Sequence, residues 1–159
     1  MRWLKRIGWA VAAVVVLAAC ARLIWTDPIG PLAGGRLSGS EAPFPADWDF
    51  SDAHFTIAVE TRPEGPHSVT TICFVHEGTL IVPAQGGSDK AWTHYVLDDP
   101  RVRIKVGERV FPAHATRILE PDPEDYFASA ARKYKRMADR TAEDRPEDIW
   151  LFRIEPREG

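Results

Sequence analysis

The sequence predicts a mainly β protein of the α+β class, a six-stranded antiparallel β-barrel with two flanking helices, preceded by an N-terminal hydrophobic anchor helix. Short segments in which apolar and polar residues alternate recur between turn signals from residue 55 to residue 154. Two segments show helical spacing instead, and a basic N-terminus is followed by an uncharged apolar run. The length of 159 residues and the 45% hydrophobic content fit one domain with a single core.

The N-terminus, residues 1–25, is predicted to be an export signal or a membrane anchor. Three basic residues lie in the first six, and residues 7–21 carry no charge. As a helix this run rises only about 22 Å, whereas the hydrocarbon core is roughly 30 Å thick, so a spanning helix must also use residues 23–25. We expect the basic residues to stay on the cytoplasmic side, which places the rest of the chain on the outer, periplasmic face of the cytoplasmic membrane.

The apolar run ends in the sequence LAAC at residues 17–20, which resembles a bacterial lipobox. The resemblance implies that Cys20 is lipidated and becomes the N-terminus of a lipoprotein. The alternative is a single uncleaved N-terminal helix, and the sequence leaves both open. In either case the chain is predicted to be tethered to the membrane.

The domain is predicted to span residues 51–159, after a tether at residues 26–50 that is rich in Pro and Gly and has no apolar periodicity. Without its first twenty residues the chain has 17 basic against 23 acidic residues, a formal charge of about −6. Nucleic acid is therefore not expected as a partner. The basic residues at 132–136 are predicted to form a solvated helix face.

Three strands are predicted in the first half of the domain. Residues 55–60 alternate in polarity, and Pro and Gly at 63–66 end this strand. The second strand, 68–75, is apolar or hydroxylated on both faces, which indicates a central position. A Glu77-Gly78 turn then leads into a third strand at 79–82.

The second half contains both predicted helices and three further strands. The first helix is capped by Ser88 and ends before Pro100, and strands follow at 102–106 and 110–119. Asp122 as cap and Pro123 as first residue begin the second helix. Its apolar stripe is expected in the core and comprises Phe127, Ala130, Tyr134 and Met137. The last strand covers 149–154.

The loop before the first helix is a candidate phosphate site. Gly86 and Gly87 allow backbone angles that turn successive N–H groups into one concavity, and Ser88 can cap the helix. Lys90 adds a positive charge near the helix N-terminus. The alternative is an ordinary loop between strand and helix.

Catalytic candidates are few. Cys73 lies inside an apolar strand and is expected to be a buried apolar residue, and no disulfide is expected within the domain because the other cysteine lies in the signal. The five histidines lack the spacing of a metal site. His94, on the helix face of Lys90, is the candidate for a proton donor or a contact to the cofactor ring, with a solvent-facing residue as the alternative. Trp92 is predicted either to stack on a cofactor or to lie in the core.

The segment GGSDKAWTHYVLDDPRVRIKVGERVFPAHATRILEPDPED, residues 86–125, resembles the FMN-binding split-barrel proteins, especially their deazaflavin-dependent nitroreductase-like branch. That branch has Gly-Gly, a basic residue, a Trp, and a Pro eight residues after the Trp. The matching residues here are Gly86, Gly87, Lys90, Trp92 and Pro100. The resemblance implies a split barrel that binds FMN or a deazaflavin and transfers hydride from its ring.

The resemblance also implies the residues of the cofactor site. Gly86, Gly87, Ser88 and Lys90 would hold the phosphate, with Thr70 and Thr71 on the strand beneath. A homodimer is expected because many proteins of this fold pair through their barrels.

Two functions follow from these expectations. The first is a membrane-tethered flavin or deazaflavin oxidoreductase, in which the cofactor carries the redox chemistry. The second is a tethered split-barrel binding module without turnover. The second is favoured by departures from the family pattern, such as Tyr95 in place of an Asn.

Overall fold

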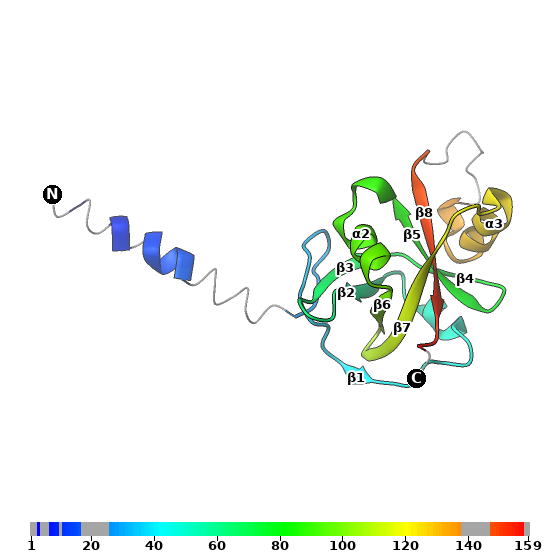
Figure 1. Cartoon of the computed structure of the whole chain (residues 1–159), viewed down its shortest axis with the longest axis horizontal. Coiled ribbons are helices and arrows are strands. Elements are labelled where there is room, and N and C mark those ends of the chain that lie inside the picture. The colour runs from blue at the N-terminus through cyan, green and yellow to red at the C-terminus, as the bar shows by residue number, and fades with distance from the viewer. Residues whose placement is uncertain (1–2, 4–6, 10, 17–25, 138–146, 158–159) are drawn as a thin grey trace.

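The computed structural model describes residues 3, 7–9, 11–16, 26–137 and 147–157 (Figure 1). The elements within residues 26–157 are the strands β1 (Ser40–Glu41), β2 (Ile57–Thr61), β3 (His67–Thr71), β4 (Phe74–His76), β5 (Thr79–Gln85), β6 (Arg101–Val106), β7 (Arg109–Ile118) and β8 (Ile149–Glu155), the helices α2 (Ala91–Asp98) and α3 (Pro123–Lys133), and the short 3-10 helices η1 (Asp49–Ala53), η2 (Gly87–Asp89) and η3 (Lys135–Met137).

The described strands form one sheet in the order β3-β2-β6-β7-β8-β5-β4. Every pairing along this path is antiparallel, and β1 adds a short parallel pairing to β7. The predicted mainly antiparallel β architecture is confirmed, but the path ends at β3 and β4 without a pairing between them, so this sheet is not closed. The strand count of six was wrong, since the described residues form eight.

The two extra strands are β1, in the N-terminal segment, and a strand that results from a break inside the segment 68–75. Its first half, β3, pairs with β2, and its second half, β4, pairs with β5 at the other end of the sheet. Between them, the Tyr134 hydroxyl accepts from the Cys73 N–H (3.3 Å) and lies 3.0 Å from the Cys73 carbonyl oxygen. An apolar run can therefore serve two partners, because a side chain satisfies the backbone where the ladder stops.

Tyr134 makes the stability of the fold sensitive to alkaline pH. The hydroxyl donates to the Phe55 carbonyl oxygen (2.7 Å), and burial raises the pKa of Tyr134 to about 12, against about 10 for an unfolded tyrosine. The neutral phenol stabilises the folded state fully below pH 10, and this contribution is lost as the pH rises towards 12. We expect the stability advantage of wild type over Tyr134→Phe to shrink by about 1 kcal/mol between pH 8 and pH 11, measured by urea unfolding. An unchanged advantage would contradict this assignment.

The two helices begin differently. In α3, Asp122 caps the helix by accepting from the Glu124 N–H (3.0 Å), and Pro123 is the first residue, as predicted. The prediction that Ser88 caps α2 was wrong. The cap position belongs to Lys90, with no side-chain cap hydrogen bond, and Ser88 lies one short helix earlier, in η2.

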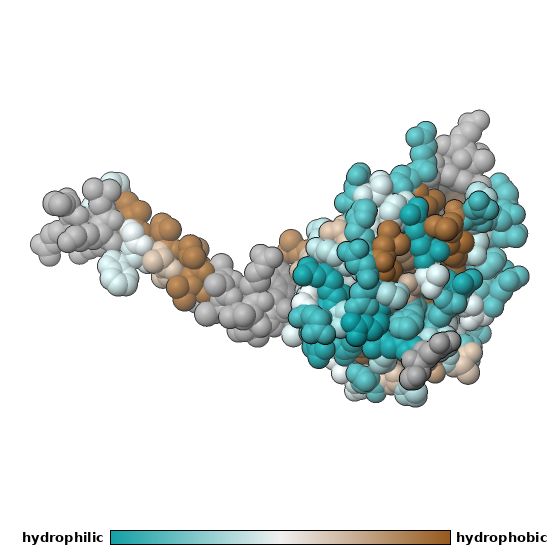
Figure 2. Space-filling view, in the orientation of Figure 1, coloured by the Kyte–Doolittle hydropathy of each residue, from teal (hydrophilic) through white to brown (hydrophobic). Residues whose placement is uncertain are grey.

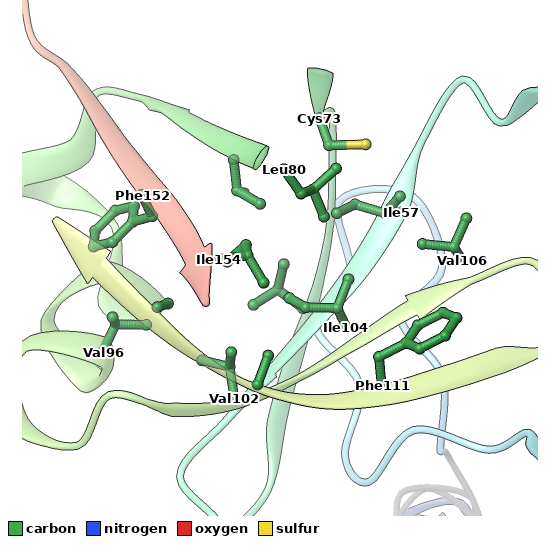
Figure 3. Close-up of a cluster of buried hydrophobic side chains, with 14 of the residues drawn as sticks. Ile57, Cys73, Leu80, Val96, Val102, Ile104, Val106, Phe111, Phe152 and Ile154 are labelled. Atoms are coloured by element: carbon green, nitrogen blue, oxygen red, sulfur yellow. The ribbon is translucent and has the colours of Figure 1, made fainter. Parts of the chain in front are cut away.

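The core fills the space enclosed by the curved sheet (Figure 3). Apolar residues alternate along β6 and β7, so that Val102, Ile104 and Phe111 point inward, and α2 adds Trp92 and Val96. A second cluster lies beneath α3 and contains Phe74, Ile81, Ala130 and Leu151. Of the stripe predicted for the core, Ala130 and Tyr134 are buried, whereas Phe127 and Met137 are half-buried.

Part of the segment predicted as a tether lies against the domain. Gly34 forms an antiparallel bridge with Ser68 on β3, and Ser40–Glu41 pairs with β7. Leu37 and Trp48 are buried, Trp48 in the main core. Isolated apolar residues among Pro and Gly carry no periodic signal, so this packing could not be predicted from the sequence pattern. The domain boundary at residue 50 stays a prediction.

The described part of the N-terminus is helical at residues 7–9 and 11–16. Figure 2 shows apolar residues gathered in this segment, whereas the face of the domain seen in the same view is mostly hydrophilic. Among the described residues, no helix has the length and apolar content needed to cross a bilayer. The predicted anchor lies partly outside the described residues, and Cys20 lies wholly outside them.

Candidate functional site

A groove of about 1130 Å³ lies where the sheet is open, between β3 and β5. Its described walls come from β3, the end of β5, the start of α2, the α3–η3 region and residues 30–33. The walls are largely apolar, with Val69, Ala84, Tyr126, Phe127 and Leu151 among them. A concave apolar site of this size suits a cofactor-sized ligand.

Cations outnumber anions among the described groove residues. Lys90, Lys135 and Arg136 are exposed along its margin, and Asp89 is the carboxylate among these lining residues. The groove therefore favours an anionic ligand.

Lys133 also lines the groove, but its ammonium is committed to the protein. Its side chain is 4% exposed and donates to the Ser51 carbonyl oxygen (2.8 Å) and to Cys73 Sγ (3.3 Å). Burial raises the pKa of the Cys73 thiol, against the opposing effect of this ammonium. The prediction of a solvated helix face was thus wrong for Lys133. Its side chain leaves the exposed side of α3 and is buried against η1.

Four predicted site residues meet in this groove, namely Thr70, Thr71, Lys90 and Trp92. Thr71 Oγ1 donates across the opening to the Pro83 carbonyl oxygen on β5 (3.4 Å). The backbone N–H and C=O of Ser68 are hydrogen-bonded to Gly34, on the side of β3 that faces away from β2. Because this direction alternates along a strand, the N–H and C=O of Thr70, two residues further, point to the same side. Trp92 lies in the core, where its ring packs on Phe152 at 5.2 Å between centroids, and it also lines the groove. Stacking of Trp92 on a cofactor stays a prediction.

The other predicted residues lie together outside the groove lining. Gly86 has the left-handed conformation (φ 65°) expected of it, and its N–H donates to the Asp148 carbonyl oxygen (2.6 Å). The Asp148 carboxylate accepts from the backbone N–H (2.9 Å) and the hydroxyl (2.7 Å) of Ser88. These hydrogen bonds lower the pKa of Asp148. The N–H and hydroxyl of Ser88, which were predicted to bind a phosphate, thus donate to a carboxylate of the protein itself.

His94 belongs to this second group. It is exposed, its Nε2 lies 2.7 Å from the Ser88 carbonyl oxygen, and its ring meets the Trp150 ring edge to face at 5.7 Å. Gly87 is buried under the same Trp150 ring. The roles predicted for His94, Gly86, Gly87 and Ser88 stay predictions, and these four residues are not among those that line the groove with Thr70, Thr71, Lys90 and Trp92.

Sequence reasoning missed several groove residues, among them Lys135, Arg136, Tyr126 and Phe127. The chain brings them to the groove through α3 packing on β4, which pairs residues far apart in sequence. The sequence did contain a local signal for two of them. Lys135 and Arg136 form a basic pair shortly after the amphipathic helix α3, and such a pair predicts a positively charged surface at the end of the helix.

The model of the family described as F420H(2)-dependent quinone reductase matches residues 57–148 of the chain. No curated protein sequence matches it. The matched residues include both groups of predicted site residues.

Two solved structures are similar in fold. A conserved hypothetical protein from Mycobacterium tuberculosis superposes with a TM-score of 0.53 at 21% identity, over 69% of this chain and 78% of that one. A putative pyridoxamine 5'-phosphate oxidase from Listeria innocua gives 0.50 at 20% identity, over 68% and 88%. These similarities concern the fold alone.

Proposed function

The chain belongs to the F420H(2)-dependent quinone reductase family, and from this premise we propose that it is an oxidoreductase that binds a deazaflavin or flavin in the groove and transfers hydride through it. The membership confirms the resemblance of residues 86–125 to the deazaflavin-dependent branch. It also agrees with the predicted class of cofactor, because F420 is a deazaflavin.

The groove fits such a cofactor. A flavin-type molecule joins a broad, flat ring to an anionic phosphate-bearing tail, and the groove offers apolar walls together with the ammonium of Lys90 and the charges of Lys135 and Arg136. This combination of an apolar wall with cations at its margin is the single observation that carries the proposal.

The residues of the chain bind and orient, while the bound cofactor supplies hydride chemistry. Lys90, at the N-terminal end of α2, would add its charge to the helix dipole and hold the phosphate. Thr70, which lines the groove from β3, would offer its hydroxyl to the ligand, and the apolar walls would exclude water from the ring. His94 is kept as the candidate proton donor, but it lies outside the groove lining, so its ring would have to leave the Ser88 carbonyl oxygen and turn towards the ligand.

A specific observation favours the second function, a binding module without turnover. The Asp148 carboxylate accepts hydrogen bonds from the N–H and the hydroxyl of Ser88, and the Ser88 carbonyl oxygen contacts Nε2 of His94. The polar groups of this part of the predicted site are therefore engaged in contacts within the protein. In this alternative the groove binds a ligand but no proton donor serves it.

We place the domain on the outer face of the cytoplasmic membrane, held by an N-terminal helix or by a lipid on Cys20. The basic start and the apolar run of residues 7–21 support this tether. A homodimer is also proposed, since the sheet path ends at the edge strands β3 and β4, which can pair with another copy.

The test is a titration of the full chain with F420 and with FMN, followed by a turnover assay with reduced F420 and a quinone. We expect saturable binding of one cofactor, weakened about tenfold by Lys90→Ala, because one charged contact is worth on the order of 1.4 kcal/mol. Arg101→Ala is the matched control, since Arg101 is an exposed cation outside the groove that pairs with Asp99.

The outcomes separate the two functions. Binding with reoxidation of F420 supports the oxidoreductase. Binding without reoxidation supports the module. If neither cofactor binds, or if Lys90→Ala and Arg101→Ala behave alike, the groove is not the site.

A further inference from the structure

A small hairpin precedes the domain and forms part of one wall of the groove. Ile29 and Leu32 exchange both backbone hydrogen bonds, at 3.1 and 3.0 Å, around a two-residue turn with Gly30 in the left-handed region (φ 56°). Residues 30–33 line the groove. We call residues 29–32 the hairpin tip.

The hairpin tip is suited to an apolar environment. The side chains of Ile29 and Leu32 are 63% and 55% exposed, although both are large and aliphatic. Their backbone N–H and C=O groups are paired with each other, and Pro31 has no N–H to satisfy. Residues 28–35 carry no charge. Water can therefore be removed from the side chains of Ile29 and Leu32 without breaking a hydrogen bond of either residue, while the backbone groups of the Gly30-Pro31 turn need polar partners such as those of the headgroup region.

The tip is also fixed to the domain. At its base, Gly35 donates to the Thr26 carbonyl oxygen (2.8 Å), and Gly34 bridges Ser68 on β3. Asp27 pairs with Lys105 on β6 (2.9 Å) and accepts from the Ser38 N–H (3.0 Å). Whatever contacts the tip is thus held beside the groove.

We propose that the hairpin tip inserts into the interfacial region of the bilayer and holds the mouth of the groove at the membrane surface. The proposal rests on the membrane tether of the proposed function. The tip lies only a few residues after the predicted anchor at residues 1–25, so an anchored chain brings Ile29 to the interface by continuity. Exposed aliphatic side chains on a hydrogen-bonded turn gain free energy there.

A lipid surface fits the tip better than a second copy of the chain. A stable protein interface buries about 1,200 Å² or more in total. Two aliphatic side chains and a proline supply far less, whereas insertion of an already anchored chain needs no such area.

The test places an environment-sensitive fluorescent amino acid at position 29 or 32 of the full chain by genetic encoding, which leaves Cys20 unchanged. The variants are mixed with vesicles of phosphatidylcholine and phosphatidylglycerol, with or without acyl-chain-brominated lipid. We expect a blue shift and quenching by the bromines at both positions. Glu64 and Glu77, on exposed turns, are the matched control positions and are expected to keep water-like emission.

Each outcome decides the proposal. Vesicle flotation of the chain with water-like emission at 29 and 32 overturns the inference but leaves the tether intact. Absence of flotation overturns both. A blue shift without vesicles shows that another part of the protein or a second copy covers the tip, and this also overturns the inference.

Discussion

Replacement of Glu60 by Gln is expected to destabilise the domain by about 1.5 to 3 kcal/mol in urea unfolding, because it removes the charge-assisted hydrogen bond to Arg103 and leaves that guanidinium with the exposed Glu41 carboxylate, 3.8 Å away, as its counter-charge. Glu60 is 3% exposed on β2 and stands opposite Arg103 on β6. Its Oε2 accepts from Arg103 Nη1 (2.8 Å) and from the Leu37 N–H (2.6 Å). The pair therefore joins two central strands to the N-terminal segment.

A double-mutant cycle distinguishes the charge from the packing. In Glu60→Gln/Arg103→Met no cation remains, and the Gln oxygen still accepts from Leu37, so the double variant is expected to be more stable than Glu60→Gln alone. The matched control is Arg153→Met, which removes an ion pair at 3.0 Å whose arginine is 47% exposed, and its cost is expected below about 1 kcal/mol. Additive single and double costs would show that the pair does not act as a unit.

Local signals predicted much of the fold. Asp122 and Pro123 specify a helix start by their own chemistry, and the Glu77-Gly78 pair takes the left-handed conformation of a tight hairpin (φ 49° and 79°). The alternation of β6 and β7 likewise decides which residues face the core. These features need only neighbouring residues, so the sequence contains them directly.

The features that sequence reasoning missed all depend on distant residues. Ser88 has the chemistry of a helix cap, but Asp148, sixty positions away, takes its N–H and hydroxyl. The break between β3 and β4 depends on Tyr134, and the position of Leu37 depends on Glu60. The same limit applies to the site, where Lys90 was found from its motif but Lys135 and Arg136 reach the groove only through the packing of α3.

Replacement of Gly87 by Ala is expected to cost about 1 to 3 kcal/mol, because the added methyl group has no space. A Cβ at this position would lie 2.3 Å from Cγ of Trp150 and 2.7 Å from its Cδ1. The indole cannot simply move away, since the guanidinium carbon of Arg117 lies 3.4 Å from its ring centroid. The measurement is urea unfolding of the full chain. In the Trp150→Leu background, where the indole is absent, Gly87→Ala is expected to cost less stability than it does in the wild type.

Gly86 is the matched control, because it needs glycine for a different reason. A Cβ there would meet nothing within 4 Å, but the backbone is left-handed with φ 65°. Gly86→Ala is therefore expected to cost about 1 kcal/mol of stability, and Gly86→Asn less, because Asn adopts the left-handed conformation more readily than Ala. The cost of Gly86→Ala is expected to be the same in the Trp150→Leu background. Equal responses of the two glycines to Trp150→Leu would refute the distinction. If it holds, the Gly-Gly pair is explained by one conformational and one packing requirement, so its occurrence in the sequence does not by itself require a bound phosphate, and the cofactor site must be judged from Lys90 and the groove.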